Sequence, residues 1–285
     1  MVAFRVLLLT LLAMIAFAAN SILCRLALKG ASIDPATFTT IRLATGAVAL
    51  YLLVRIRGNR VRAKGDWASA VALFAYAGAF SFAYVSLPAG TGAMLLFGAV
   101  QATMVIAGLR SGETLSIVQS AGLLLAIAGL IGLVLPGIMA PPLSGSILMV
   151  CAGIAWGVYS LRGRGVGDPV SATAGNFIRA TPLALLTSAA ALPWAHYDAR
   201  GAALAVISGV FASGLGYILW YAALPGLTAT RAAAVQLSVP VIAALGGIAF
   251  LDETISVRLA VASLATLGGI ALVIGDRTQL NRRSS

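Results

Sequence analysis

Two arginines lie inside long apolar stretches of the sequence, where a charged side chain is costly. Arg42 and Arg179 occur in matching contexts, because each directly follows an isoleucine. A guanidinium in such a place needs a partner or water, and its planar fork fits a carboxylate. The pair therefore predicts that one or both arginines bind the carboxylate of a small-molecule substrate. The alternative is that they bond backbone carbonyls or extend their charged ends to the membrane interface.

Aromatic side chains recur at helical spacing in similar stretches. Tyr76, Phe80 and Tyr84 are spaced four residues apart, which places them on one face of a helix. Aromatic walls with a few amide and hydroxyl groups suit a ligand that has a large apolar side chain and polar ends. The alternative is that the rings pack in the core or form a belt at the membrane interface. Together with Arg42 and Arg179, the predicted substrate-binding residues are Asn20, Tyr76, Phe80, Tyr84, Phe97, Gln101, Trp156, Tyr159, Tyr217, Trp220, Tyr221, Gln236 and Ser238.

An internal duplication organises the chain. A Glu-Thr-aliphatic-Ser segment occurs at 113–116 and again at 253–256, and each copy is followed by a long apolar run. The same landmarks precede each copy: a tyrosine, a Leu-Pro pair three residues later, and then a glutamine (Tyr84, Leu87-Pro88 and Gln101; Tyr221, Leu224-Pro225 and Gln236). Landmarks in a fixed order indicate a repeat. We predict one repeat over residues 1–138 and a second over 139–285.

Glu113 and Glu253 each stand just before an apolar run. A carboxylate at the start of a helix satisfies free N–H groups and interacts favourably with the helix dipole. We therefore expect both glutamates to be structural caps rather than substrate ligands. Pro240, within the ninth apolar run, is the third residue to which we assign a structural role.

The composition indicates a membrane protein. The 285 residues are 60% hydrophobic and only 9% charged, whereas about a quarter of the residues of a soluble domain are charged. The net charge of +11 does not indicate nucleic acid, because the basic residues are spread over several short loops. Cys24, Cys151 and the single histidine, His196, lie too far apart in the sequence to suggest a metal site. No cofactor is predicted, nor is an enzyme, which would need a nucleophile with a base or a metal cluster in the spans.

Ten apolar runs are long enough to cross a ~30 Å hydrocarbon core, which takes ~20 helical residues. The first of them resembles a signal peptide, with Arg5 before it and Ala16-Phe17-Ala18 within it. Its segment 15–21 has a counterpart at 154–160, however, so we retain it as a span. The sequence thus predicts an all-α integral membrane protein. The predicted spans are 6–28, 35–55, 66–87, 90–109, 115–135, 143–162, 170–192, 202–224, 229–250 and 256–275.

The landmarks align the first five runs with the last five. Because five is odd, the second copy must enter the membrane from the opposite side. The two five-helix halves are therefore expected to be inverted repeats. That architecture is characteristic of secondary transporters, in which the substrate site lies near the midplane where the halves meet.

The distribution of lysine and arginine predicts the orientation, because these residues concentrate in cytoplasmic loops. We expect both termini to be cytoplasmic and the protein to lie in a bacterial inner membrane. With the N-terminus inside, the outer side carries only Arg25, Lys29, Arg200 and Arg258. The inner side carries Arg5, Arg55, Arg57, Arg60, Arg62, Lys64, Arg110, Arg162, Arg164, Arg231, Arg277, Arg282 and Arg283.

These features together carry a resemblance that covers essentially the whole chain. Two five-helix units, the Glu-Thr-aliphatic-Ser turn before the last helix of each, and Pro240 resemble the EamA family of the drug/metabolite transporter (DMT) superfamily. Within it, the aromatic content and plan are similar to bacterial aromatic amino-acid exporters of the YddG type. One departure is that the first half has Ala102-Thr103 near the place that matches Pro240. The resemblance implies a peripheral position for the fifth and tenth spans.

We therefore expect a secondary transporter that exports aromatic or hydrophobic amino acids by alternating access. Its central cavity would be lined by spans 1, 3, 4, 6, 8 and 9. Export of other metabolites or drugs, such as amines, nucleobases or sugars, is the alternative within the family. A channel or structural membrane protein is the alternative of another class. All acidic residues fall in loops or at span ends, so we expect uncoupled diffusion or exchange rather than proton antiport through a buried acid.

Overall fold

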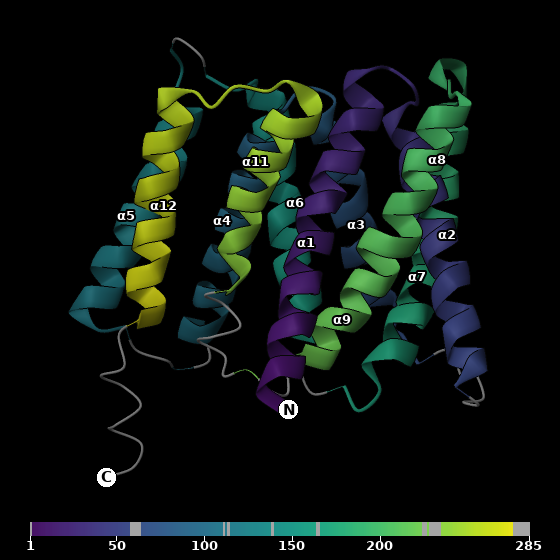
Figure 1. Cartoon of the computed structure of the whole chain (residues 1–285), viewed down its shortest axis with the longest axis horizontal. Helices are drawn as coiled ribbons and strands as arrows, with labels where there is room; N and C mark the ends of the chain where they lie inside the picture. Colours follow the sequence, from purple (N-terminus) through teal and green to yellow (C-terminus); the bar gives the residue numbers. More distant parts are fainter. Residues whose placement is uncertain are drawn as a thin grey trace.

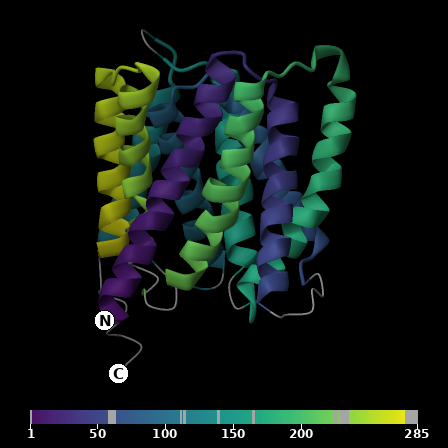
Figure 2. The same ribbon diagram turned by 45° about the vertical axis from the view of Figure 1, so that its right-hand side comes forward.

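The computed structural model describes residues 2–57, 64–110, 112, 115–137, 140–163, 166–223, 227 and 235–275. Within these ranges every regular element is a helix, and the helices stand side by side in one bundle (Figures 1 and 2). The eighth span is a continuous rod of α8 (Ala199–Ile207), a π-helical turn η2 (Ser208–Leu215) and α9 (Gly216–Ala223), preceded by a short turn η1 (Leu192–Trp194). The other helices are α1 (Val2–Lys29), α2 (Pro35–Ile56), α3 (Trp67–Tyr84), α4 (Ala89–Arg110), α5 (Ile117–Val134), α6 (Leu143–Arg162), α7 (Pro169–Ala190), α11 (Ser238–Leu251) and α12 (Val257–Gly275).

The predicted all-α, multi-pass architecture is confirmed. In the described ranges, seven helical segments have the length and hydropathy needed to cross a membrane: α1 to α6 and the rod from α8 to α9. The helices α11 and α12 are apolar but shorter in the described part, and α7 is 22 residues long. The start of the ninth predicted run, 229–250, lies outside the described part, which leaves out residues 228–234, and α11 begins at Ser238.

Short polar side chains mark where many of the helices begin. Ser116 accepts a hydrogen bond from the Gln119 backbone N–H at the start of α5, and Ser256 accepts one from the Leu259 N–H at the start of α12. The serine of each Glu-Thr-aliphatic-Ser segment is therefore a helix cap, which satisfies an N–H group that has no partner within the helix. Aspartates do the same for four other helices: Asp34 for α2, Asp66 for α3, Asp168 for α7 and Asp198 for α8.

Helices from the two halves of the sequence pack against one another. The helix α5 lies along α12, α2 along α7, α3 along α6, α4 along α6 and α11, and α1 along α11 and the α8–α9 rod. In Figure 1, α5 and α12 form one edge of the bundle, and α1, α3 and α6 lie nearer its middle. The pair α5–α12 is antiparallel, because Gln119 Nε2 donates to Val273 O (3.2 Å) at one end and Arg258 Nη1 donates to Leu135 O (2.6 Å) at the other.

The contact between α5 and α12 is close enough for backbone to meet backbone. A Cβ atom at Gly122 would lie 2.5 Å from the Gly269 carbonyl oxygen, whereas one at Gly132, on the same helix, would meet nothing within 4 Å. We expect Gly122→Ala to force the helices apart and to lower stability by about 1–3 kcal/mol. By contrast, Gly132→Ala should raise it by up to about 1 kcal/mol through helix propensity. Thermal unfolding in detergent measures both variants, and equal losses would contradict the close contact at Gly122.

Candidate functional site

Arg42 lies deep in the bundle and is the largest of the fully buried side chains, at 1% exposure. Its Nε donates to Ser213 Oγ on η2 (2.9 Å), and its Nη2 donates to the Tyr76 hydroxyl on α3 (3.1 Å). The guanidinium carbon lies 5.2 Å from the ring centroid of Tyr76 and 5.0 Å from that of Phe80. At such distances a ring face stabilises a cation. Neutral side chains thus hold this charge in place.

A chain of hydrogen bonds continues from Arg42 to α1. The Tyr76 hydroxyl also accepts from Asn20 Nδ2 (3.2 Å), and Asn20 Oδ1 accepts from Ser208 Oγ (2.7 Å). Asn20 is 5% exposed, and Ser208 and Ser213 are fully buried. The network therefore joins α1, α2, α3 and η2 through the Arg42 guanidinium, an amide and hydroxyl groups, and we call it the polar centre.

Part of the hydrogen-bonding capacity at this centre is unused. Within the described ranges, Arg42 Nη1 and the Tyr217 hydroxyl have no hydrogen-bond partner. Arg42 also lacks an ionic partner there, since the ion pairs are Arg25–Glu253, Lys64–Asp168 and Arg162–Asp66. An unpaired buried charge and unsatisfied donors both raise the free energy of the folded state. Such donors fit an anionic ligand, and a carboxylate matches the guanidinium best.

Aromatic rings surround the polar centre. Trp156 lies between Tyr76 and Tyr217, with its ring centroid 4.8 Å from each. Tyr76, Phe80 and Tyr84 form a row along α3, as their spacing predicts. We call the whole set the aromatic cluster, in which neighbouring centroids are 4.7–6.2 Å apart: Phe17, Tyr76, Phe80, Tyr84, Trp156, Tyr159, Phe177, Tyr217 and Trp220.

Arg179 differs from Arg42 in burial and in partners. It is half-buried on α7, and its Nη1 donates to the Gly175 carbonyl one turn earlier, at 2.9 Å. A bond to a carbonyl of its own helix is the alternative that we considered for the arginines. The structure thus separates two residues that the sequence presents as a pair.

Apart from Tyr221 and Glu253, the other predicted residues that the structure describes lie on α4, just before α11 or in the first turn of α11. Phe97 and Gln101 are buried in α4, and the Gln101 amide nitrogen has no partner in the described part. Gln236 is buried, and Ser238 Oγ donates to the nearby Val235 carbonyl (2.6 Å). Pro240 lies in the first turn of α11, where its missing N–H removes no bond within the helix. Glu113 lies outside the described residues.

Glu253 caps a helix, but not the helix that follows it. Its Oε2 accepts from the backbone N–H of Ala89, the first residue of α4 (2.8 Å), and its Oε1 accepts from Arg25 Nε (3.1 Å). Ser256 caps α12 instead. The capping role expected of Glu253 thus applies to α4 rather than to α12, because the fold brings the start of α4 within its reach.

Further contacts of Arg25 and of Lys29 lie at the same end of the bundle. Arg25 Nη1 also donates to the carbonyls of Tyr84 and Val85, at 2.9 Å each, and Lys29 Nζ donates to the Leu251 carbonyl (2.5 Å). The side chains of Arg25 and Glu253 are only 12% and 11% exposed. A largely buried ion pair thus ties α1 to the turn between α3 and α4 and to the loop before α12.

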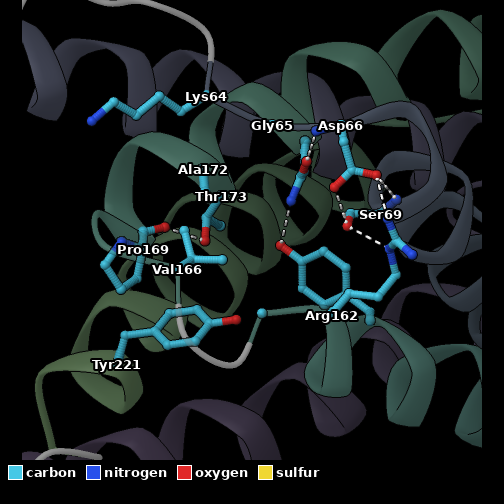
Figure 3. A pocket seen from close by; sticks show the side chains of 13 residues that line it. Lys64, Gly65, Asp66, Ser69, Arg162, Val166, Pro169, Ala172, Thr173 and Tyr221 are labelled. Atoms are coloured by element: carbon cyan, nitrogen blue, oxygen red, sulfur yellow. Dashed lines mark hydrogen bonds and ion pairs between the residues drawn. The ribbon is translucent and has the colours of Figure 1, made fainter.

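The other end of α3 opens onto a cavity of about 230 Å³ between α3, α6, α7 and α9 (Figure 3). The charged side chains that line it are Lys64, Asp66 and Arg162, and Arg162 Nη2 donates to Asp66 Oδ1 at 2.8 Å. Tyr159 of the aromatic cluster and Tyr221 also line the cavity. Tyr221 therefore belongs to this cavity rather than to the cluster, and the cavity reaches the cluster at Tyr159.

The sequence analysis did not identify Phe17 and Phe177 of the aromatic cluster, or Ser208 and Ser213 of the polar centre. Phe17 could have been found, because it is the counterpart of Trp156 in the duplicated segment. The two serines are five residues apart, a spacing that does not fit one face of an α-helix. Only the π-helical turn brings them together, and we see no signal in the sequence for Phe177.

Comparisons with known proteins agree with this architecture. A protein of Pseudomonas aeruginosa, the uncharacterized protein PA1977, is 55% identical over 274 residues, which cover 96% of this chain and 96% of that protein. A crystal structure of a protein with 19% identity matches with a TM-score of 0.63 over 95% of this chain and 99% of its own, which shows a shared fold. The profile of the EamA-like transporter family matches residues 4–135 and again residues 143–275. The chain therefore belongs to the EamA-like transporter family and is a membrane transporter.

Proposed function

We propose that this protein exports aromatic and large hydrophobic amino acids by alternating access to a central site at Arg42. Membership of the EamA family implies a transporter rather than an enzyme, with a small-molecule substrate and a lipid environment. The observation that carries the substrate class is the buried Arg42 guanidinium beside aromatic rings, with one nitrogen unpaired. A neutral ligand leaves this charge uncompensated, whereas a carboxylate neutralises it.

The proposed site divides the substrate into two parts. Its carboxylate accepts hydrogen bonds from Arg42 Nη1 and from the Tyr217 hydroxyl, which are two of the buried groups without a hydrogen-bond partner in the described part of the chain. Its side chain packs against Trp156 and the neighbouring rings. Each buried CH₂ group adds about 0.8 kcal/mol, so phenylalanine and leucine are favoured over glycine and alanine.

Alternating access is supported by the way in which contacts recur between the two halves. The third span of each half packs on the first span of the other half: α3 packs on α6, and the α8–α9 rod packs on α1. The fourth spans do the same, since α4 packs on α6 and α11 packs on α1. Such correspondence is expected of inverted repeats over residues 1–138 and 139–285. The Arg25–Glu253 pair closes one end while a cavity opens at the other. A movement that exchanges these states exposes the site to each side in turn.

The charges at the two ends support an orientation in which the cavity faces the cytoplasm. Lys64 and Arg162 line the cavity, and they belong to the lysine- and arginine-rich set that favours the cytoplasmic side. The helix α1 begins, and α12 ends, at this end of the bundle (Figure 1), in keeping with two cytoplasmic termini. In this orientation the cavity admits substrate from the cytoplasm, and the closed end faces outward.

A ligand screen tests the substrate class. Thermal unfolding of the purified protein is followed with amino acids, amines, nucleobases and sugars. We expect L-phenylalanine, L-tryptophan and L-leucine to stabilise it, by about 2.7 kcal/mol at 100 times the dissociation constant. Phenethylamine keeps the ring but lacks the carboxylate, so it should bind about tenfold more weakly. A response to sugars or nucleobases alone would reject the proposal, and saturable counterflow in vesicles distinguishes a transporter from a channel.

Transport is expected to be insensitive to pH near neutrality. Hydrogen bonds from Ser69, with the ion pair to Arg162, hold the pKa of Asp66 at about 2, and hydrogen bonds from Ser171 lower the pKa of Asp168. A lowered pKa keeps each carboxylate ionised, so its stabilising contribution is present at neutral pH and lost only in acid. Uptake by vesicles should vary less than about twofold between pH 6 and 8 and need no pH gradient. Strict dependence on a gradient would contradict uncoupled transport.

A further inference from the structure

The eighth span changes from α-helix to π-helix where it passes Arg42. In the π-helical turn η2, hydrogen bonds join residues i and i+5, so residues five apart lie on the same face. In an α-helix the same two residues are about 140° apart around the axis. Ser208 and Ser213 are five apart, and both hydroxyls reach the polar centre, at Asn20 and at Arg42. The π-helical geometry is therefore what brings both serines to this centre.

The backbone of η2 is also in close contact with the helix that carries Arg42. A Cβ atom at Gly209 would collide with the Arg42 carbonyl oxygen and with Thr45 Oγ1, both on α2. Glycine is thus required for this approach. The turn η2 therefore lies against the Arg42 backbone and accepts a hydrogen bond from its guanidinium.

We propose that Ser213 and Ser208 are positioning residues that orient Arg42 and Asn20 for the substrate carboxylate. Ser213 accepts from Nε and Tyr76 accepts from Nη2, so the plane of the guanidinium is fixed and Nη1 is the nitrogen left for a ligand. Ser208 in turn fixes the Asn20 amide that bonds the Tyr76 hydroxyl. This inference rests on the proposed carboxylate site, and it makes η2 a determinant of selectivity for substrates that carry a carboxylate.

A buried serine that does not contact Arg42 provides a matched control for Ser213. Ser146 on α6 is 2% exposed, and its hydroxyl donates to the Pro142 carbonyl one turn earlier (2.9 Å). Both Ser213→Ala and Ser146→Ala remove one buried hydroxyl that makes one hydrogen bond. Only Ser213→Ala releases Arg42 Nε.

The first test compares three probes by calorimetry: L-phenylalanine, 3-phenylpropionate and phenethylamine. We expect Ser213→Ala to weaken the two carboxylates about tenfold, while phenethylamine changes less than twofold and Ser146→Ala changes none of them. Equal weakening of all three probes by Ser213→Ala would overturn the positioning role. If Arg42→Gln weakens the carboxylates and Ser213→Ala does not, the proposed function stands and this inference fails. If Arg42→Gln leaves them unchanged, the carboxylate site itself fails.

A second test needs no ligand. In protein labelled with ¹⁵N-arginine, the Nε–H signal of Arg42 is assigned by its loss in Arg42→Gln. We expect this proton to exchange with water about ten times faster in Ser213→Ala than in the wild type or in Ser146→Ala, because the bond to Ser213 protects it. Unchanged exchange would show that Ser213 does not hold the guanidinium, and would overturn the inference.

Discussion

Replacing Arg42 with glutamine is expected to weaken the binding of L-phenylalanine by about 10- to 100-fold, because hydrogen bonds to a charged group contribute ~1.5–3 kcal/mol. The same change should cost the unliganded protein little stability. Arg42 is buried without an ionic partner in the described part, so its removal also relieves a desolvation penalty of several kcal/mol. That relief offsets the lost bonds to Ser213 and Tyr76. Calorimetry measures the binding, and thermal unfolding without ligand measures the stability.

Arg179→Gln is the matched control for this prediction. Arg179 is half-buried, and its Nη1 donates to a carbonyl of its own helix, so we expect its replacement to change binding less than about twofold. If Arg42→Gln unfolds the protein, Arg42 has a structural role instead. If both variants lose binding equally, the site is not centred on Arg42.

The sequence predicts the helices well because the membrane makes their limits a local property. The predicted runs 35–55 and 143–162 correspond to Pro35–Ile56 and Leu143–Arg162. The third run was predicted to reach residue 87, whereas α3 ends at Tyr84. Apolar length and short polar caps define each span, and both can be read without knowing what the span packs against.

The site is less predictable because its parts come from distant segments. Arg42 and Arg179 have the same local context, and what distinguishes them is the surroundings of Arg42. Its bond to Ser213 joins residues 171 positions apart, and its bond to Tyr76 joins residues 34 apart. Ser213 reaches it only through a π-helical turn, which no pattern of apolar residues indicates. Glu253 likewise lies 164 positions from its partner Ala89.

Breaking the Arg25–Glu253 pair is expected to open the closed end of the bundle and to raise the labelling rate of Cys24 about tenfold or more. Cys24 is fully buried next to Arg25, so a thiol reagent reaches it only when this end opens. In Glu253→Gln the charge of Arg25 loses its buried partner, and breaking such a pair costs ~3–5 kcal/mol. Opening lets water solvate Arg25, so the equilibrium shifts toward the open form. Maleimide labelling in a Cys151→Ala background, which removes the other cysteine, measures the shift.

The ion pair between Arg162 and Asp66, at the opposite end of the bundle, is the control for this prediction. Arg162 and Asp66 are 2.8 Å apart but 44% and 53% exposed, and exposed pairs contribute only ~0–1 kcal/mol. Asp66→Asn should therefore change Cys24 labelling less than about twofold.

A second labelling site tests whether the two ends of the bundle are coupled. Alternating access requires the cavity to close as the other end opens. Glu253→Gln should therefore slow the labelling of an Ala172→Cys variant, because residue 172 lines the cavity. If Cys24 is labelled faster and the labelling rate at residue 172 is unchanged, Glu253 only stabilises the local turn. If neither labelling rate changes, other contacts keep the Cys24 end closed.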